Sequence, residues 1–144
     1  MTAGIALIKQ LVPVATLALL AACTSDPLPR PGSWRIVNYW AVWCTPCREE
    51  IPELNTLHVY NNVNVLGVNY DGKQGDELQA QADTLGIKFA LLANDPSQDL
   101  GTSRPQVLPT TLIVAPDGRL LKTLVGPQTA HALMTVLHEL GYRE

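Results

Sequence analysis

Two cysteines with the spacing of a reactive pair, Cys44 and Cys47, lie three positions apart in the stretch NYWAVWCTPCREEIP. A pair with this spacing can form a structural disulfide, supply half of a metal site, or alternate between disulfide and dithiol. A structural zinc site takes about four ligands, usually from two pairs, and the chain has neither a second CxxC pair nor an HxxxH spacing. A disulfide that closes so short a loop restrains the unfolded chain only weakly. The pattern therefore favours a redox pair over a static clip or a metal ligand pair.

The segments on either side of Cys44 predict a strand before it and a helix after it. The run RIVNYW, residues 35–40, is β-branched and aromatic, which is typical of a buried strand. A helix over residues 45–60 places Cys47 and Leu54 on one face, where they can pack against a sheet. Cys44 is therefore expected at the seam between a strand and a helix.

This position is expected to activate Cys44. The first N–H groups of a helix have no partner within the helix, and the helix dipole is positive there. A thiolate at Cys44 would accept those N–H groups, so the pKa of Cys44 is expected to lie below that of a free cysteine. Pro46 fits the first helical turn, which needs no N–H from it. Cys47 lies one turn further in, is expected to be shielded, and would attack the mixed disulfide that Cys44 forms with a substrate.

The rest of the chain predicts an α/β domain built on a mixed sheet with helices on both faces. The first two strands and the helix between them form a βαβ unit, so those strands should be parallel. A short turn capped by Asp95, in DPSQDLG, is expected before the final hairpin. The further elements expected are a strand over residues 63–68, a helix over 75–85 ending at Gly86, a short strand in KFALLA, a hairpin of strands 110–114 and 120–125 around PDG, and a last helix within 127–141.

The N-terminus predicts a segment that is removed from the mature chain. Residues 1–22 carry one lysine and then an uncharged run that is short for a membrane span and contains Pro13. The four residues LAAC resemble a bacterial lipobox, which implies that Cys23 becomes the acylated first residue and attaches to a lipid bilayer. Three prolines in residues 24–33 then favour a tether. The expected division is a signal peptide over 1–22, a tether over 23–33 and a domain over 34–144.

Composition excludes some classes of function. The 144 residues suit one domain, and the formal net charge is −3. No run of Lys and Arg suggests a nucleic acid partner. Neither a cofactor nor a metal is expected.

Two motifs carry a resemblance to a known family. The sequence WCTPC behind VNYWAV resembles the thioredoxin active site, and WCTPCREEIPEL resembles the TlpA/ResA-like branch of membrane-tethered, extracytoplasmic thioredoxins. The sequence VLPTTLIVAPDG is similar to the second signature of that branch, and the similarity spans residues 36–140. The resemblance implies a thioredoxin-like α/β fold with a small central α-β insertion, which corresponds here to GDELQAQADTLGIKFALLA.

The resemblance also implies roles for particular residues. The bond before Pro109 is expected to be cis and to face the CxxC pair, and Leu108 is expected to pair its backbone with the substrate. Glu50, one helical turn after Cys47, is expected to help move protons, although it could instead belong to a solvated Arg-Glu-Glu face. Trp43 is expected to line the exposed active-site surface with Pro46. Trp40, in the strand before the pair, is expected in the core.

Two departures from the family pattern affect these expectations. Asn38 stands where thioredoxins carry a buried aspartate, and an amide cannot serve as a base, so more of that role falls to Glu50 or to water. The branch usually has a β-hairpin before the first core strand, whereas residues 24–33 resemble a tether. Substrate recognition by such a hairpin is therefore in doubt.

The function that these observations favour is an extracytoplasmic thiol–disulfide oxidoreductase on the periplasmic side of a bacterial membrane. By analogy with the family it would reduce oxidised envelope proteins, including apocytochrome c, and would receive electrons from a membrane thiol-electron transporter. Thr24 after Cys23 does not favour inner-membrane retention, which conflicts with a donor in that membrane. A disulfide-forming oxidant or isomerase and a lipid-anchored binding module remain alternatives, and a thiol peroxidase fits the CxxC context less well.

Overall fold

The computed structural model describes residues 26–144. The expected signal peptide over residues 1–22 and the expected acylation site at Cys23 lie outside the described residues. Within the part of the chain that is described, no helix combines the length and the apolar character that crossing a bilayer requires.

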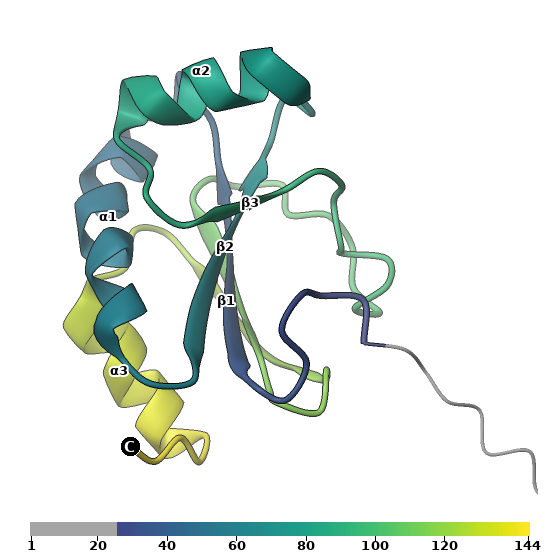
Figure 1. Cartoon of the computed structure of the whole chain (residues 1–144), viewed down its shortest axis with the longest axis vertical. Coiled ribbons are helices and arrows are strands. Elements are labelled where there is room, and N and C mark those ends of the chain that lie inside the picture. Colours follow the sequence, from purple (N-terminus) through teal and green to yellow (C-terminus); the bar gives the residue numbers. More distant parts are fainter. Residues whose placement is uncertain (1–25) are drawn as a thin grey trace, which may run out of the picture.

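A five-stranded mixed sheet forms the centre of the domain, with the strands in the order β3-β2-β1-β4-β5 (Figure 1). The strands are β1 (Trp34–Trp40), β2 (Val63–Asn69), β3 (Ala90–Leu92), β4 (Thr110–Val114) and β5 (Leu120–Val125). The first three strands are parallel, and β4 is antiparallel to both β1 and β5. The predicted βαβ unit, the short third strand and the final hairpin are therefore confirmed.

Three α-helices accompany the sheet within residues 26–144. They are α1 (Thr45–Thr56), α2 (Gly75–Leu85) and α3 (Ala130–Glu139). The first helix is shorter than predicted, because the chain tightens into a 3-10 turn, η1 (Leu57–Val59), instead of continuing to residue 60. α2 ends as predicted at Gly86, whose φ of 68° is the left-handed conformation that glycine adopts without strain.

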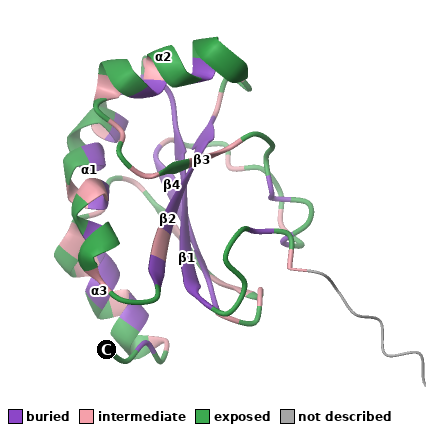
Figure 2. Ribbon diagram, in the orientation of Figure 1, coloured by how far each residue is buried: buried purple, intermediate pink, exposed green. Residues whose placement is uncertain are grey.

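The three helices bury their apolar side chains on one face of the sheet. Trp34 and Ile36 of β1 pack with side chains of α1 and α3, namely Leu54, Leu133 and Leu137. Trp40, which lies on the same face because side chains alternate along a strand, packs with Leu78 and Ala82 of α2. Figure 2 shows the buried stripes of α1 and α3 turned toward the strands.

The opposite face of the sheet is covered by loop segments, so the expectation of helices on both faces is wrong. Val37 and Tyr39 of β1 pack there with Leu28 and Leu100. Leu100 lies in the turn that Asp95 was predicted to cap, and Asp95 Oδ1 accepts the Ser97 N–H at 2.9 Å. The segment that follows β3 is rich in Pro, Gly and Asp, which favour turns, and it covers the sheet without forming a helix.

The N-terminal segment is also part of the packed domain. Leu28 is 4% exposed, and the guanidinium of the fully buried Arg35 forms an ion pair with Asp26. Arg35 also donates a hydrogen bond to the Ser33 carbonyl at 2.7 Å. The sequence placed the start of the domain near Trp34, whereas Asp26, Leu28 and Ser33 already contact the domain.

Candidate active site

Cys44 and Cys47 form a disulfide at the N-terminus of α1. Cys44 is the N-cap residue with an extended backbone, and its Sγ accepts the Cys47 N–H at 3.2 Å. Pro46 lies in the first turn, where a missing N–H costs nothing. The seam between strand and helix predicted for Cys44 is therefore present, and an N–H donor already points at its sulfur.

The disulfide is almost covered by protein. The residues Cys44 and Cys47 are 4% and 1% exposed. The sequence distinguished an outer cysteine from a shielded one, but in the disulfide form both are buried in a cluster that includes Trp40 and Leu78. Trp40 is fully buried, as expected of a core residue.

An apolar rim, made of Trp43, Val107, Leu108 and Val125, lies on the segments next to Cys44 and next to the cis bond. Trp43 is 60% exposed, and Leu108 packs against the cluster that contains both cysteines. The Leu108–Pro109 bond is cis, as the resemblance implies. Val107 and Val125 are also exposed, at 53% and 61%. These loops bring together residues that are far apart in the sequence.

The cis bond and the end of β5 lie side by side. The Pro109 carbonyl accepts the Gly126 N–H at 2.9 Å, and Thr110 pairs with Val125. The rim around the disulfide therefore combines the start of α1, the loop before β4 and the loop after β5.

Glu50 is buried beneath this rim and takes part in a network of uncharged donors. Its carboxylate accepts Asn38 Nδ2 at 3.1 Å, the Gln128 N–H at 3.2 Å and Thr111 Oγ1 at 3.4 Å. Burial raises the pKa of Glu50 to about 7, and the three hydrogen bonds oppose that rise only in part. Glu50 and Cys47 are both among the buried residues of α1, one turn apart. The alternative of a solvated face is therefore wrong for Glu50.

Asn38 lies in the same network and is 1% exposed. Within the described residues its Oδ1 is buried without a hydrogen-bond partner. The amide therefore acts as a donor to Glu50 and leaves the proton chemistry of this pocket to the carboxyl group.

Sequence reasoning did not single out the residues that hold Trp43. The Trp43 indole N–H donates to both carboxylate oxygens of Asp71, at 3.1 and 3.0 Å. The Tyr70 ring meets the Trp43 ring edge to face at a centroid distance of 6.4 Å, and the Arg104 guanidinium lies 4.0 Å over Tyr70. The available signal was position, because Tyr70 and Asp71 are the first two residues after a parallel strand, at the carboxyl end of the sheet.

Neither the described side chains nor their spacing suggests a metal centre. Within residues 26–144 no group of three or more His, Cys, Asp or Glu side chains is arranged to hold a metal ion.

A mixed sheet, a CxxC disulfide at the start of a helix and a cis-proline before β4 together define a protein with a thioredoxin-like fold. Residues 24–123 match the family model described as the AhpC/TSA family, and the chain belongs to this family. The exposed lipoprotein thioredoxin Etrx1 of Streptococcus pneumoniae shares the fold, with a TM-score of 0.61 and 23% identity over 75% of this chain and 85% of that one.

Two sequence relatives sharpen the comparison. The chain is 34% identical over 101 residues to the thiol:disulfide interchange protein HelX of Rhodobacter capsulatus. The aligned segment covers 69% of this chain and 56% of HelX. It is 28% identical over 104 residues to the thiol-disulfide oxidoreductase ResA of Bacillus thuringiensis. That aligned segment covers 71% of this chain and 60% of ResA. The chain thus spans less than two thirds of these relatives, and the resemblance to the ResA-like branch is confirmed.

Proposed function

We propose that the protein is a thiol–disulfide oxidoreductase that exchanges the Cys44–Cys47 pair with disulfides of client proteins. The observation that carries this proposal is the disulfide at the start of α1, with the Cys47 N–H already directed at Cys44 Sγ. The names of the relatives HelX and ResA support the same reaction class. A structural clip would need neither the helix N-terminus nor the cis-proline.

The exchange transfers two electrons from the protein to the client disulfide in two steps. In the reduced protein the Cys44 thiolate attacks a client disulfide, which forms a mixed disulfide and releases one client thiolate. Cys47 then attacks Cys44 Sγ, which restores the Cys44–Cys47 disulfide and releases the second client thiolate. The helix N-terminus stabilises Cys44 as an attacking thiolate and later as a leaving group.

Glu50 supplies the proton acceptor for the second step. Cys47 must lose its proton to attack, and a carboxyl group with a pKa of about 7 accepts and returns a proton near neutral pH. Glu50 lies one turn along the same buried face of α1. Asn38 and Thr111 hold the carboxyl group in this position.

The apolar rim receives the client. Trp43 exposes apolar surface next to an almost covered disulfide, and Val107 and Val125 expose more of it near the cis bond, a combination that suits a peptide laid across them. Leu108 presents its backbone next to the cysteine cluster, where an extended client strand can pair with it.

The direction of exchange and the location complete the proposal. The protein acts as an extracytoplasmic reductant of envelope proteins, including apocytochrome c, is anchored through acylated Cys23, and receives electrons from a membrane thiol-electron transporter. The similarity to an exposed lipoprotein thioredoxin supports the anchor, and Cys23-dependent incorporation of labelled palmitate tests it. Potentials in this fold span about −270 to −120 mV, so a measured value at the oxidising end would overturn the reductant in favour of an oxidant or isomerase.

The Cys47→Ser variant is the direct test of exchange. Without Cys47 the mixed disulfide on Cys44 is not released, so the variant should accumulate covalent client adducts, detected on non-reducing gels and identified by mass spectrometry. The matched control is Cys44→Ser, which retains only Cys47 of the pair and should trap nothing through it. Equal trapping by both variants, or none by either, contradicts the proposal and leaves the binding-module alternative.

A further inference from the structure

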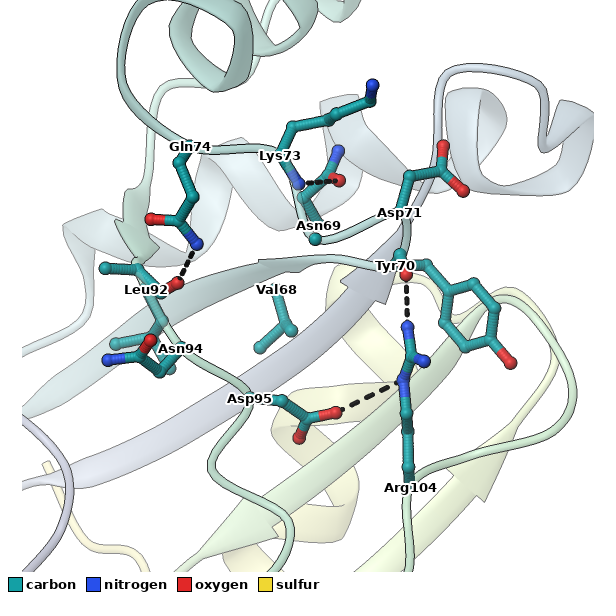
Figure 3. A pocket seen from close by; sticks show the side chains of 12 residues that line it. Val68, Asn69, Tyr70, Asp71, Lys73, Gln74, Leu92, Asn94, Asp95 and Arg104 are labelled. Carbon is teal, nitrogen blue, oxygen red and sulfur yellow. Dashed lines mark hydrogen bonds and ion pairs between the residues drawn. The ribbon is translucent and has the colours of Figure 1, made fainter.

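A cavity of about 400 Å³ opens at the carboxyl ends of β2 and β3 (Figure 3). Its walls are residues 68–74, residues 92–95 and Arg104. The strands β1, β2 and β3 are parallel, so their carboxyl ends share one edge of the sheet with Cys44, which follows β1. Ligands of open α/β sheets bind outside this edge.

The cavity shares two wall residues with the surroundings of Trp43. Two of its lining residues, Tyr70 and Asp71, are the residues that contact the Trp43 indole. Trp43 directly precedes Cys44 in the sequence. Tyr70 and Asp71 therefore stand between the cavity and the residue that precedes the reactive cysteine.

The wall around Arg104 is preformed. Arg104 Nε lies 3.3 Å from Asp95 Oδ2, and Asp95 Oδ1 accepts the Tyr39 hydroxyl at 2.7 Å. The Arg104 guanidinium stacks on Tyr70, and the Tyr70 hydroxyl donates to the Pro105 carbonyl at 3.2 Å. These contacts connect the cavity to the loop that leads to the cis bond, so the cavity and this loop are held in a fixed position relative to each other.

The cavity has balanced charge and open hydrogen-bonding capacity. Asp95 is paired with Arg104, and Lys73 lies 2.6 Å from Glu77, so its cations are already partnered. Among the described residues Asn94, which lines the cavity at its exposed edge, makes no side-chain hydrogen bond (Figure 3). Gln74 donates its Nε2 to Ala93 and keeps its Oε1 open. Amides without net charge match the backbone and uncharged polar side chains of a peptide.

We propose that this cavity binds an uncharged polar segment of the client polypeptide, a few residues from the cysteine that Cys44 attacks. The inference rests on the proposed exchange function. The walls are the two ends of the central insertion, the connection from β2 to α2 and the chain after β3. The insertion thereby gives the domain a second recognition surface beside the apolar rim.

Paired peptide substrates test the assignment. One peptide carries a Cys-Ala-Ala-Cys disulfide with short end caps, and others add a flank of Ser, Asn and Gln on the N-terminal or the C-terminal side. The reduced full-length protein should reduce one of the flanked peptides with kcat/KM about fivefold above that of the capped peptide, the effect of one or two hydrogen bonds. Peptides with flanks of Asp or of Lys in the same positions should show a smaller increase in kcat/KM.

Asn94→Trp fills the cavity without touching the disulfide. This variant should lose the preference for the flanked peptide and reduce the capped peptide within about twofold of the wild-type rate. Asn61→Trp, at an exposed asparagine outside the cavity, is the matched control and should keep the preference. Asn94→Ala removes the amide without adding bulk, and it should also weaken the preference for the flanked peptide.

The outcomes separate the cavity from the exchange reaction. Equal rates for all peptides in the wild type, a preference for a charged flank, or a preference that survives in Asn94→Trp overturns the cavity assignment and leaves the exchange function intact. An equal loss on both peptides in Asn94→Trp overturns it too, because the residue would then act on the disulfide. Reduction of no peptide by the wild type overturns the exchange function as well.

Discussion

Strand β1 carries a buried polar contact on each of its faces, and the two contacts treat charge in opposite ways. On one face the fully buried Arg35 is paired with Asp26 and donates to the Ser33 carbonyl. On the other face Asn38 donates to Glu50, and all three donors to this carboxylate are uncharged. One carboxylate is compensated by a cation, and the other is held in its site by neutral groups.

The difference separates a structural contact from a chemical one. A compensated pair costs much to break and holds the N-terminal segment on the sheet. An uncompensated buried carboxyl group has a raised pKa, and Glu50 therefore changes protonation near neutral pH, one turn from the disulfide. The comparison teaches that the pH sensitivity of this domain should belong to the face that carries α1.

The largest expected effect comes from breaking the compensated contact. Asp26→Ala leaves the Arg35 guanidinium buried without its carboxylate, and we expect a loss of about 3 to 4 kcal/mol in the free energy of unfolding. Denaturant unfolding of the oxidised protein measures it. Asp99→Ala, at an exposed aspartate of the same region, should change stability by about 0.5 kcal/mol or less. A loss from Asp26→Ala no greater than that of the control would show that the pair is not structural.

The second effect concerns the uncompensated carboxyl group and depends on pH. The folded-state pKa of Glu50, about 7, lies above its ordinary value of 4.5, so the folded protein binds the extra proton between these pH values. Stability from this group is therefore complete below pH 4.5 and falls as the pH rises through 7, by about 3 kcal/mol in total.

Glu50→Gln should remove this pH dependence, because the amide keeps the shape but does not titrate. Unfolding free energies of the oxidised variant measured from about pH 4.5 to pH 8 should follow a flatter curve than the wild type. Glu49→Gln, at an exposed neighbour on the same helix, should keep the wild-type slope. A Glu50→Gln curve as steep as the wild-type curve would assign the dependence to another group.

The face with the active site was largely readable from the sequence. The CxxC pair and the cis-proline signature each lie in a continuous run, so a local motif places Cys44 and Pro109 on their elements. The spacing of Glu50 from Cys47 puts both on one helical face, but it left a solvated face open as an alternative, and only the structure shows that Glu50 is buried.

The other features depend on contacts between distant segments, and local patterns do not encode them. Asp26 lies in a proline-rich run that resembles a linker, and only folding brings it to Arg35. Asp71 and Arg104 are charged residues of the kind expected on a solvated surface. Asp71 nevertheless accepts a hydrogen bond from Trp43, which lies 28 positions away in the sequence. The second face of the sheet is covered by a turn-rich segment, and periodicity cannot reveal packing by a loop.

The smallest expected effect comes from giving the Glu50 network a second acid. Asn38 Nδ2 lies 3.1 Å from Glu50 Oε2, so Asn38→Asp places two carboxyl groups in one buried site. Like charges in contact cannot both ionise easily, so the pair should hold one proton to higher pH. The midpoint of the pH-dependent loss of stability should move upward by about one unit.

Unfolding of Asn38→Asp across the same pH range measures this midpoint, which belongs to the coupled pair rather than to either carboxyl group. Asn61→Asp, at an exposed asparagine, should leave the midpoint unchanged because solvent screens the added charge. A midpoint that moves downward in Asn38→Asp would mean that the added group is solvated or paired with a cation. The buried site would then stabilise charge in the same way as the Arg35 face, and the contrast between the two faces of β1 would be lost.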